Sequence, residues 1–143
     1  MNIRSYVIAL IIKNKKILII QESKPECRGK WFLPGGRVED NETVKDAMMR
    51  EIKEEANLNV HLEGLFYFDE SFSESIRRYR FVFLCTPDSM AEKDFEDENS
   101  IQSKWVAFDE ITQFDLRSPI VGELIEKYKL SQNFMDIGNY NTI

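Results

Sequence analysis

The chain has 143 residues, of which 43% are hydrophobic and 31% are charged. This composition is typical of a folded globular protein and excludes a disordered chain. The length suits one domain with its own hydrophobic core and leaves little room for a second. A formal net charge of −6 argues against a broad basic surface, so long nucleic acids are not expected as partners.

The cysteine content and the hydropathy indicate in which cellular compartment the protein is expected. Cys27 and Cys85 are the two cysteines, and because they lack a metal-site spacing we expect free thiols without a disulfide or zinc. The apolar run at 6–12 is followed by lysines and by no cleavage site, which favours a buried strand over a signal peptide. No run reaches the ~20 apolar residues of a membrane span. We therefore expect a cytoplasmic protein.

The first third of the chain predicts strands and loops. Apolar runs rich in β-branched residues at 3–12 and 16–21 indicate a hairpin that turns at Lys13-Asn14-Lys15. Loops are predicted at 22–30 and 37–41, on either side of the apolar run 31–33 and the Pro34-Gly35-Gly36 break.

The remainder alternates between strands and two helices. We predict helices at 43–56 and 119–129, strands at 58–68, 77–85 and 102–108, a turn at 69–75, an irregular acidic segment at 86–100 and a tail at 131–143. Mixed strands with two helices favour an α/β/α sandwich, in which one helix covers each face of a mixed sheet. We assign 1–143 to a single domain, with its core at about 3–130.

The first predicted helix has an unusual acidic face. Thr43 and Asp46 have the spacing of a capping box, which places the helix start there. At about 100° per residue, Val44, Ala47, Met48 and Ile52 form one apolar stripe, and Glu51, Glu54 and Glu55 continue it. Three carboxylates therefore point toward the protein interior.

Inward carboxylates require either raised pKa values or a cation, because like charges repel and burial disfavours the ionised form. A divalent ion with oxygen ligands, Mg²⁺ above all, meets this requirement. The alternative is that Glu51 to Glu55 form a solvated helix end that serves only solubility. The orientation of the acids and the glycines just upstream favour the metal site.

These residues fall into a longer pattern. Gly36, Glu42, Arg50-Glu51-Ile52, Glu54-Glu55 and Leu58 have the spacing G-x5-E-x7-R-E-U-x-E-E-x-G-U, where U is apolar, and the segment resembles the Nudix box. Asn57 replaces the second glycine, at a helix end where a left-handed backbone is expected and Asn tolerates it. The segment from Trp105 to Ile111 is similar to a motif near the end of Nudix domains, so the resemblance covers roughly 3–130.

The resemblance implies a metal-dependent hydrolase of nucleoside diphosphate derivatives. Glu54, Glu55 and the backbone carbonyl of Gly36 would bind Mg²⁺, or Mn²⁺ in its place, and Glu51 would share an ion or act as general base. Arg50 would orient the carboxylates and Glu42 would support Arg50.

The general base is open at this point. Some family members take it from a later loop, which in this sequence makes Glu98 the first candidate and Asp97 the second. The alternative for the run 92–98 is a solvated charge cluster without a catalytic role.

The substrate is less constrained than the chemistry. The runs 21–24, 26–34 and 36–37 resemble the branch that acts on oxidised guanine diphosphates such as 8-oxo-dGDP, in which Gly35 is an alanine. Aromatic and arginine side chains suit a purine and a phosphate, and our candidates are Arg28, Phe68, Arg78 and Tyr79.

Two alternative functions are consistent with the sequence. One is a pyrophosphatase for ADP-ribose or a nucleotide sugar, and the other is an inactive Nudix domain that only binds a nucleotide. The partner in each case is a small nucleotide, without a membrane, and the chain is a monomer or a homodimer.

Overall fold

A computed structural model describes residues 1–138 of the chain. Its strands are β1 (Asn2–Lys13), β2 (Lys16–Gln21), β3 (Trp31–Phe32), β4 (Gly35–Arg37), β5 (Val60–Phe72), β6 (Ile76–Pro87) and β7 (Gln102–Ala107). The helices are α1 (Val44–Ala56) and α2 (Ile120–Leu130), with short 3₁₀ turns at Pro25–Cys27 and Phe108–Gln113.

The strands form one mixed sheet. Its path is β3-β2-β1-β6-β5, with β4 paired to β1 and β7 paired to β2. β1 and β6 run parallel over ten residue pairs, from Asn2 with Ile76 to Ile11 with Cys85, while the other pairs are antiparallel. The long β1 therefore joins both halves of the sheet.

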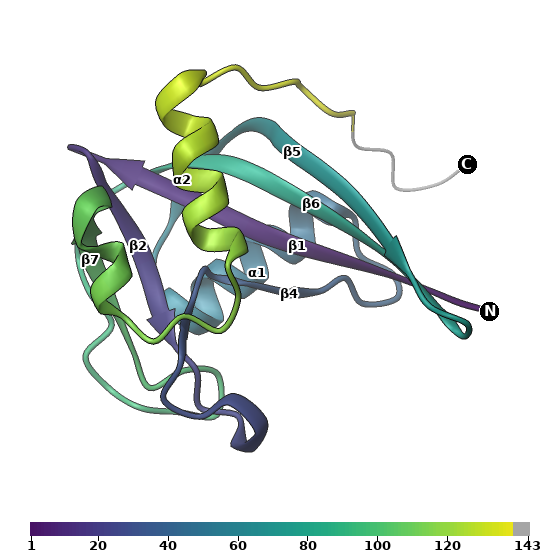
Figure 1. Cartoon of the computed structure of the whole chain (residues 1–143), viewed down its shortest axis with the longest axis horizontal. Helices are drawn as coiled ribbons and strands as arrows, with labels where there is room; N and C mark the ends of the chain where they lie inside the picture. The colour runs from purple at the N-terminus through teal and green to yellow at the C-terminus, as the bar shows by residue number, and fades with distance from the viewer. Residues whose placement is uncertain (139–143) are drawn as a thin grey trace.

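Each face of the sheet carries one helix and one hydrophobic core, because neighbouring residues of a strand point to opposite faces. Leu10, Val82 and Leu84 pack beneath α2, while Ala9, Ile11 and Phe83 pack beneath α1. Figure 1 shows α2 in front of the sheet and α1 behind it. The predicted α/β/α sandwich is confirmed.

Helix α1 begins and ends as its sequence predicts. The Thr43 hydroxyl accepts the backbone N–H of Asp46 at 3.1 Å, and the Asp46 carboxylate accepts the backbone N–H of Thr43 at 3.5 Å. Asn57 ends the helix with φ 51° and ψ 44°, and its N–H donates to Lys53. The left-handed cap expected at this position is confirmed.

The predicted hairpin between β1 and β2 is confirmed. Lys13 pairs with Lys16, so the turn is Asn14-Lys15, and both residues have positive φ values, which suit the right-handed twist of the strands.

Two predictions around strands are wrong. The break at Pro34-Gly35-Gly36 ends strand β3 as predicted, but the two glycines and Arg37 are not loop, because Gly35–Arg37 pairs with Tyr6, Val7 and Ile8 of β1 as strand β4. The turn predicted at 69–75 is also too long. The strands continue to Phe72 and resume at Ile76, where the carbonyl accepts the N–H of Ser73 at 2.8 Å.

Part of the tail packs on the sheet edge. Leu65 of β5 and Met135 exchange two backbone hydrogen bonds of 2.7 and 2.9 Å. The end of the predicted tail, 139–143, lies outside the described residues. Within 1–138, neither helix has the length and apolar character needed to cross a membrane.

Substitution of Asn57 tests the helix end. Asn57→Ala should lower the free energy of unfolding by about 1 kcal/mol. Alanine is strained in the left-handed region, because it has a Cβ but lacks the short polar side chain by which asparagine tolerates this conformation. Asn57→Gly should not lower it. Urea denaturation measures both, with exposed Asn59→Ala as the control. Equal stability of Asn57→Ala and the wild type would contradict the role of the cap.

Candidate active site

The site is built where α1 packs against strand β4. Glu55, in the last turn of α1, is 7% exposed, and its Oε1 accepts the backbone N–H of Gly35 at 2.7 Å. Burial raises the pKa of the Glu55 carboxyl well above its ordinary value, and the Gly35 hydrogen bond offsets only part of this effect. Among residues 1–138, Glu55 therefore has this one hydrogen-bond donor and makes no ion pair.

Glu51 occupies the space left by the missing side chain of Gly36. A Cβ at Gly36 would lie 2.3 Å from Glu51 Oε1, so only glycine allows the carboxylate to approach this strand. Burial raises the pKa of the Glu51 carboxyl, although a hydrogen bond from Arg50 opposes this shift. The two acids of α1 thus meet the two glycines of β4.

Arg50 connects the acids of this region. Its guanidinium donates two hydrogen bonds to Glu42, of 3.0 and 2.7 Å, one to Glu51 at 2.9 Å and one to Glu54 at 3.5 Å. A further bond reaches the carbonyl of Arg37 at 3.1 Å. The hydrogen bonds from Arg50 lower the pKa of Glu42, and the carboxylates raise the pKa of Arg50. Arg50 therefore fixes α1 to the loop that precedes it.

The oxygen ligands available in this site are of the kind that a hard divalent ion binds. Carboxylates and a backbone carbonyl are the ligands that Mg²⁺ prefers, and buried Glu55 makes no ion pair within residues 1–138. Among residues 1–138, however, no three acidic, histidine or cysteine side chains converge closely enough to hold an ion as they stand. Glu54 is the most exposed of the three acids, with 39% of its side chain exposed.

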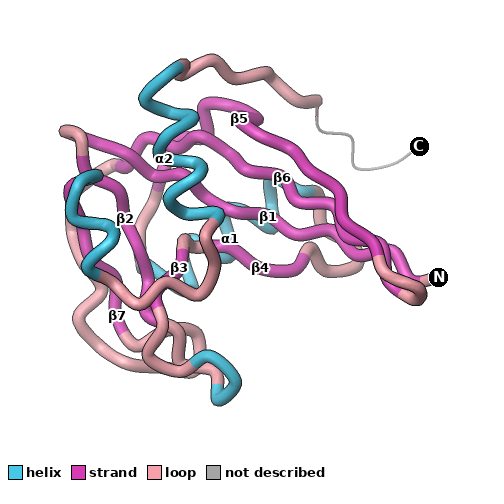
Figure 2. Tube along the Cα trace, in the orientation of Figure 1, coloured by secondary structure: helices cyan, strands magenta, loops and turns pink. Residues whose placement is uncertain are grey.

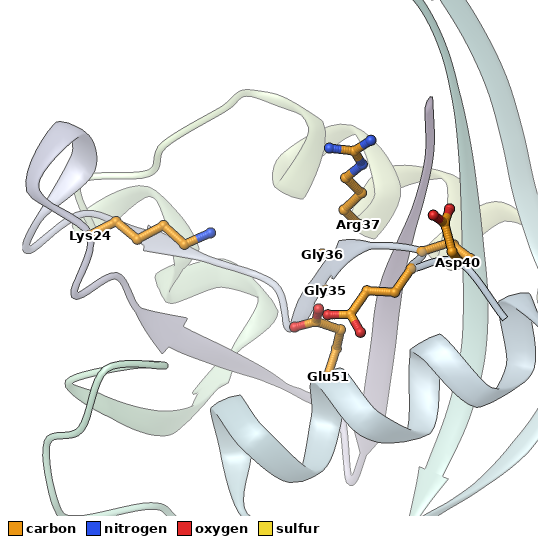
Figure 3. A pocket seen from close by; sticks show the side chains of 8 residues that line it. Lys24, Gly35, Gly36, Arg37, Asp40 and Glu51 are labelled. Carbon is orange, nitrogen blue, oxygen red and sulfur yellow. The ribbon is translucent and has the colours of Figure 1, made fainter. Parts of the chain in front are cut away.

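Two adjoining cavities open beside the glycines and share Lys24, Gly35, Gly36 and Arg37. The first, of about 610 Å³, is lined by Glu51, Glu39 and Asp40 as well. Figure 3 shows the side chains of Glu51 and Lys24 directed toward the glycine strand. The second, of about 520 Å³, extends over β1 and β6 and reaches Glu55.

The second cavity is rich in cations, which the sequence analysis did not foresee. Five basic and two acidic side chains line it, namely Lys24, Arg37, Arg78, Arg80, Arg117, Glu22 and Glu55. Arg80 pairs with Asp69 through bonds of 2.8 and 2.6 Å, and Arg117 pairs with Glu22. Within residues 1–138, Lys24, Arg37 and Arg78 make no ion pair. The alternation Arg78-x-Arg80 on a strand was the sequence signal for this cluster.

The candidate substrate residues do not lie together. Arg78 lines the cavity, but Tyr79 points to the opposite face, where it stacks on Phe68 at 5.9 Å. Phe68 contacts Phe81 at 5.1 Å on that face, on the side of α1. Arg28 pairs with Glu96 at the surface at 2.9 Å. Of the four candidates, the structure brings only Arg78 to the cavity that adjoins the acids.

The acidic segment 86–100 lies beside the C-terminal end of α1. Glu98 is exposed and its backbone carbonyl accepts the Ser23 hydroxyl, while the Asp97 carboxylate pairs with buried Lys93 at 2.6 Å. Neither side chain lines the two cavities. Figure 2 shows that the loops 22–30 and 88–101 gather at the same end of the molecule.

The fold and the contact between α1 and β4 define a class of small α/β/α sandwiches, in which an acidic helix packs against a strand that contains glycines. The model of the NUDIX domain matches residues 2–128, and the chain belongs to the Nudix hydrolase family. The structure is similar to a NUDIX hydrolase from Nitrosomonas europaea, with a TM-score of 0.83, 24% identity and coverage of 96% and 97% of the two chains.

Two of the similar proteins are named for an activity on oxidised guanine nucleotides. The human 8-oxo-dGDP phosphatase NUDT18 is 39% identical over 107 residues, which cover 73% of this chain and 32% of the relative. The 8-oxo-dGTP diphosphatase of Buchnera aphidicola is 28% identical over 120 residues, covering 83% of this chain and 88% of the relative. The chain thus spans about a third of the length of the first relative.

Alanine at the two glycines should have different effects. A Cβ at Gly35 would lie 2.2 Å from the carbonyl oxygen of Val7, so backbone must move and Gly35→Ala should destabilise the fold by about 1–3 kcal/mol. Gly36→Ala displaces only the flexible end of Glu51 and should cost less than about 1 kcal/mol. Urea unfolding compares them, with Gly122→Ala as the control for open space, which should raise stability because alanine favours a helix more than glycine does. A greater loss for Gly36→Ala would refute this geometry.

Proposed function

We propose that the chain hydrolyses phosphoanhydride bonds of nucleoside diphosphate derivatives with the help of Mg²⁺, and that oxidised guanine diphosphates such as 8-oxo-dGDP are the first substrates to test. The observation that carries this proposal is the cavity that Lys24, Arg37 and Arg78, without ion pairs within 1–138, line together with Glu55 of α1. Unpaired cations in a cavity of an acidic protein favour an anionic ligand.

The volume and position of the cavities support a small nucleotide. Both are within the range of about 300–1,000 Å³ that is usual for small-molecule sites. Since they share the glycine strand, a phosphate near Gly36 and a nucleoside near Phe32 would fit along one continuous groove.

Glu54, Glu55 and the carbonyl of Gly36 are the groups that would hold the ion, and Glu51 would either share it or act as general base. When bound, Mg²⁺ supplies an activated water and offsets the charge on the phosphate oxygens. Arg50 donates hydrogen bonds to Glu51 and Glu54. On binding the ion, each of these carboxylates would either keep its hydrogen bond to the guanidinium or give it up. Arg50 would then limit their movement and keep them facing the glycines.

Glu51 is the better candidate for the general base. It lines the first cavity and its carboxyl has a pKa raised by burial, which brings a carboxylate closer to the range useful for proton transfer near neutral pH. The side chain of Glu98 is exposed, and that of Asp97 is already paired with Lys93. We therefore infer that the water loses its proton to Glu51.

Two further functions remain outcomes of the test. ADP-ribose or a nucleotide sugar would place a second sugar in the groove, and no observation on the cavity favours either over a nucleoside diphosphate. An inactive binding domain has less support, since Asn57 adopts the backbone that the missing glycine would provide.

Activity is tested on 8-oxo-dGDP, dGDP, ADP-ribose and UDP-glucose with MgCl₂, by chromatography of the products. We expect hydrolysis of 8-oxo-dGDP, and Glu51→Gln should lower kcat about a hundredfold or more, the usual loss on removing a general base. Exposed Glu110→Gln is the matched control. No hydrolysis of any of these compounds, or full activity of Glu51→Gln, would reject the proposed function.

The second cavity, which Arg78 lines, is tested by substituting two neighbouring arginines of β6. Arg78→Gln should raise KM about tenfold or more with a smaller change in kcat, because a hydrogen bond between charged groups contributes about 1.5–3 kcal/mol. Arg77→Gln should leave KM unchanged, since Arg77 points to the opposite face and pairs with Glu70 at 2.7 Å. Equal effects of the two substitutions would exclude the cavity as the substrate site.

A further inference from the structure

Lys93 is a buried lysine with exposed neighbours in the acidic segment 86–100. The residue is 2% exposed and its side chain is fully buried, although Asp94, Phe95 and Glu96 beside it are exposed. Burying an ammonium group is costly unless other groups compensate for its lost hydration. The contacts of Lys93 should therefore identify what this segment does.

The ammonium group has partners for its donors. Nζ lies 2.6 Å from Asp97 Oδ1 and 2.8 Å from the Ser100 hydroxyl, with longer contacts of 3.4 Å to the carbonyls of Ser100 and Glu54. Asp97 Oδ1 also accepts the backbone N–H groups of Asn99 and Ser100. The acidic segment is thus folded around this lysine and is not a solvated charge run.

The network ends on the last turn of α1. Ser100 donates its hydroxyl hydrogen to the carbonyl of Glu55 at 2.6 Å, next to the Lys93 contact with the carbonyl of Glu54. Carbonyls in the last turn of a helix have no partner within the helix, and a positive charge there also interacts favourably with the helix dipole. The two carbonyls held in this way belong to the two residues whose carboxylates are proposed metal ligands.

The segment is itself fixed to the sheet. The backbone N–H of Lys93 donates to the Ser103 hydroxyl of β7 at 2.7 Å, and the N–H of Ile101 donates to the carbonyl of Gln21 in β2 at 2.8 Å. A path of hydrogen bonds therefore runs from the sheet through Lys93 and Ser100 to the backbone of Glu54 and Glu55.

We propose that Lys93 and Ser100, together the α1 clamp, are positioning residues that set the carboxylates of Glu54 and Glu55 for the divalent ion. This inference rests on the proposed function, because it assumes that these acids bind the ion. The clamp acts on the backbone, so it leaves every carboxylate oxygen free for the ion or for Gly35.

A clamp that only stabilises the fold would have other consequences. Loss of Lys93 would then lower the stability of the protein, while the folded fraction would bind metal and turn over substrate as the wild type does. A positioning role predicts weaker metal binding and lower kcat in protein that is fully folded. The two roles are separated by measuring metal binding directly, without substrate.

The experiment measures Mn²⁺ binding by the loss of the free-ion signal in electron paramagnetic resonance, and kcat and KM at saturating Mg²⁺, on the full chain. Lys93→Met should weaken Mn²⁺ binding and lower kcat about tenfold or more with little change in KM, as is usual when a residue that orients metal ligands is lost. Lys93→Arg should recover part of both. Lys104→Met, at an exposed position of β7, is the control.

Ser100→Ala provides a second variant, because it removes only the hydroxyl between Lys93 and Glu55. It should change Mn²⁺ binding and kcat in the same direction by a smaller factor, and it decides the outcome if Lys93→Met does not fold. Folded variants with wild-type Mn²⁺ affinity and kcat would overturn the proposal. A wild-type protein that binds no Mn²⁺ would instead reject the metal site, and with it this role of the clamp.

Discussion

The contact between helix α1 and the glycine strand β4 is the constraint on which the site depends. Strand β4 can lie beside β1 only because Gly35 has no Cβ, and Glu51 can approach it only because Gly36 has none. The N–H of Gly35 then serves as a donor for the buried Glu55. One short strand thus makes room for the carboxylate of Glu51 and provides the only protein hydrogen bond that the carboxylate of Glu55 receives among the described residues.

Two basic side chains fix the acidic helix, one from within it and one from the acidic segment. Arg50 binds the carboxylates of Glu42 and Glu51, and Lys93 lies at the carbonyls of the last turn. Neither pairs with Glu55, whose carboxyl stays buried beside the two glycines of β4. The charge that the fold leaves uncompensated is therefore located where the proposed ion would bind, rather than spread evenly over the helix.

Local sequence was sufficient to predict α1 because its determinants are close in the chain. The capping box, the apolar stripe and the left-handed Asn57 each depend on residues within a few positions. The inward direction of Glu51 and Glu55 followed from the same periodicity. Glu54 is more exposed than this pattern implies, because it lies at the margin of the stripe, where Arg50 holds it at 3.5 Å.

The cavity and the clamp were not predictable in this way, because distant segments form them. Gly35–Arg37 became a strand through its register with β1, and Lys93 became buried through contacts with α1 and β7. The grouping of Arg78 with Tyr79 failed for a simpler reason. Neighbouring residues of a strand face opposite sides, so these two side chains could not share a site.

Net charge was also a poor guide to the partner, since it averages an acidic exterior with a cationic cavity. An anion that reaches those cations must fit a groove of a few hundred cubic ångströms, which favours a single nucleotide over a polymer.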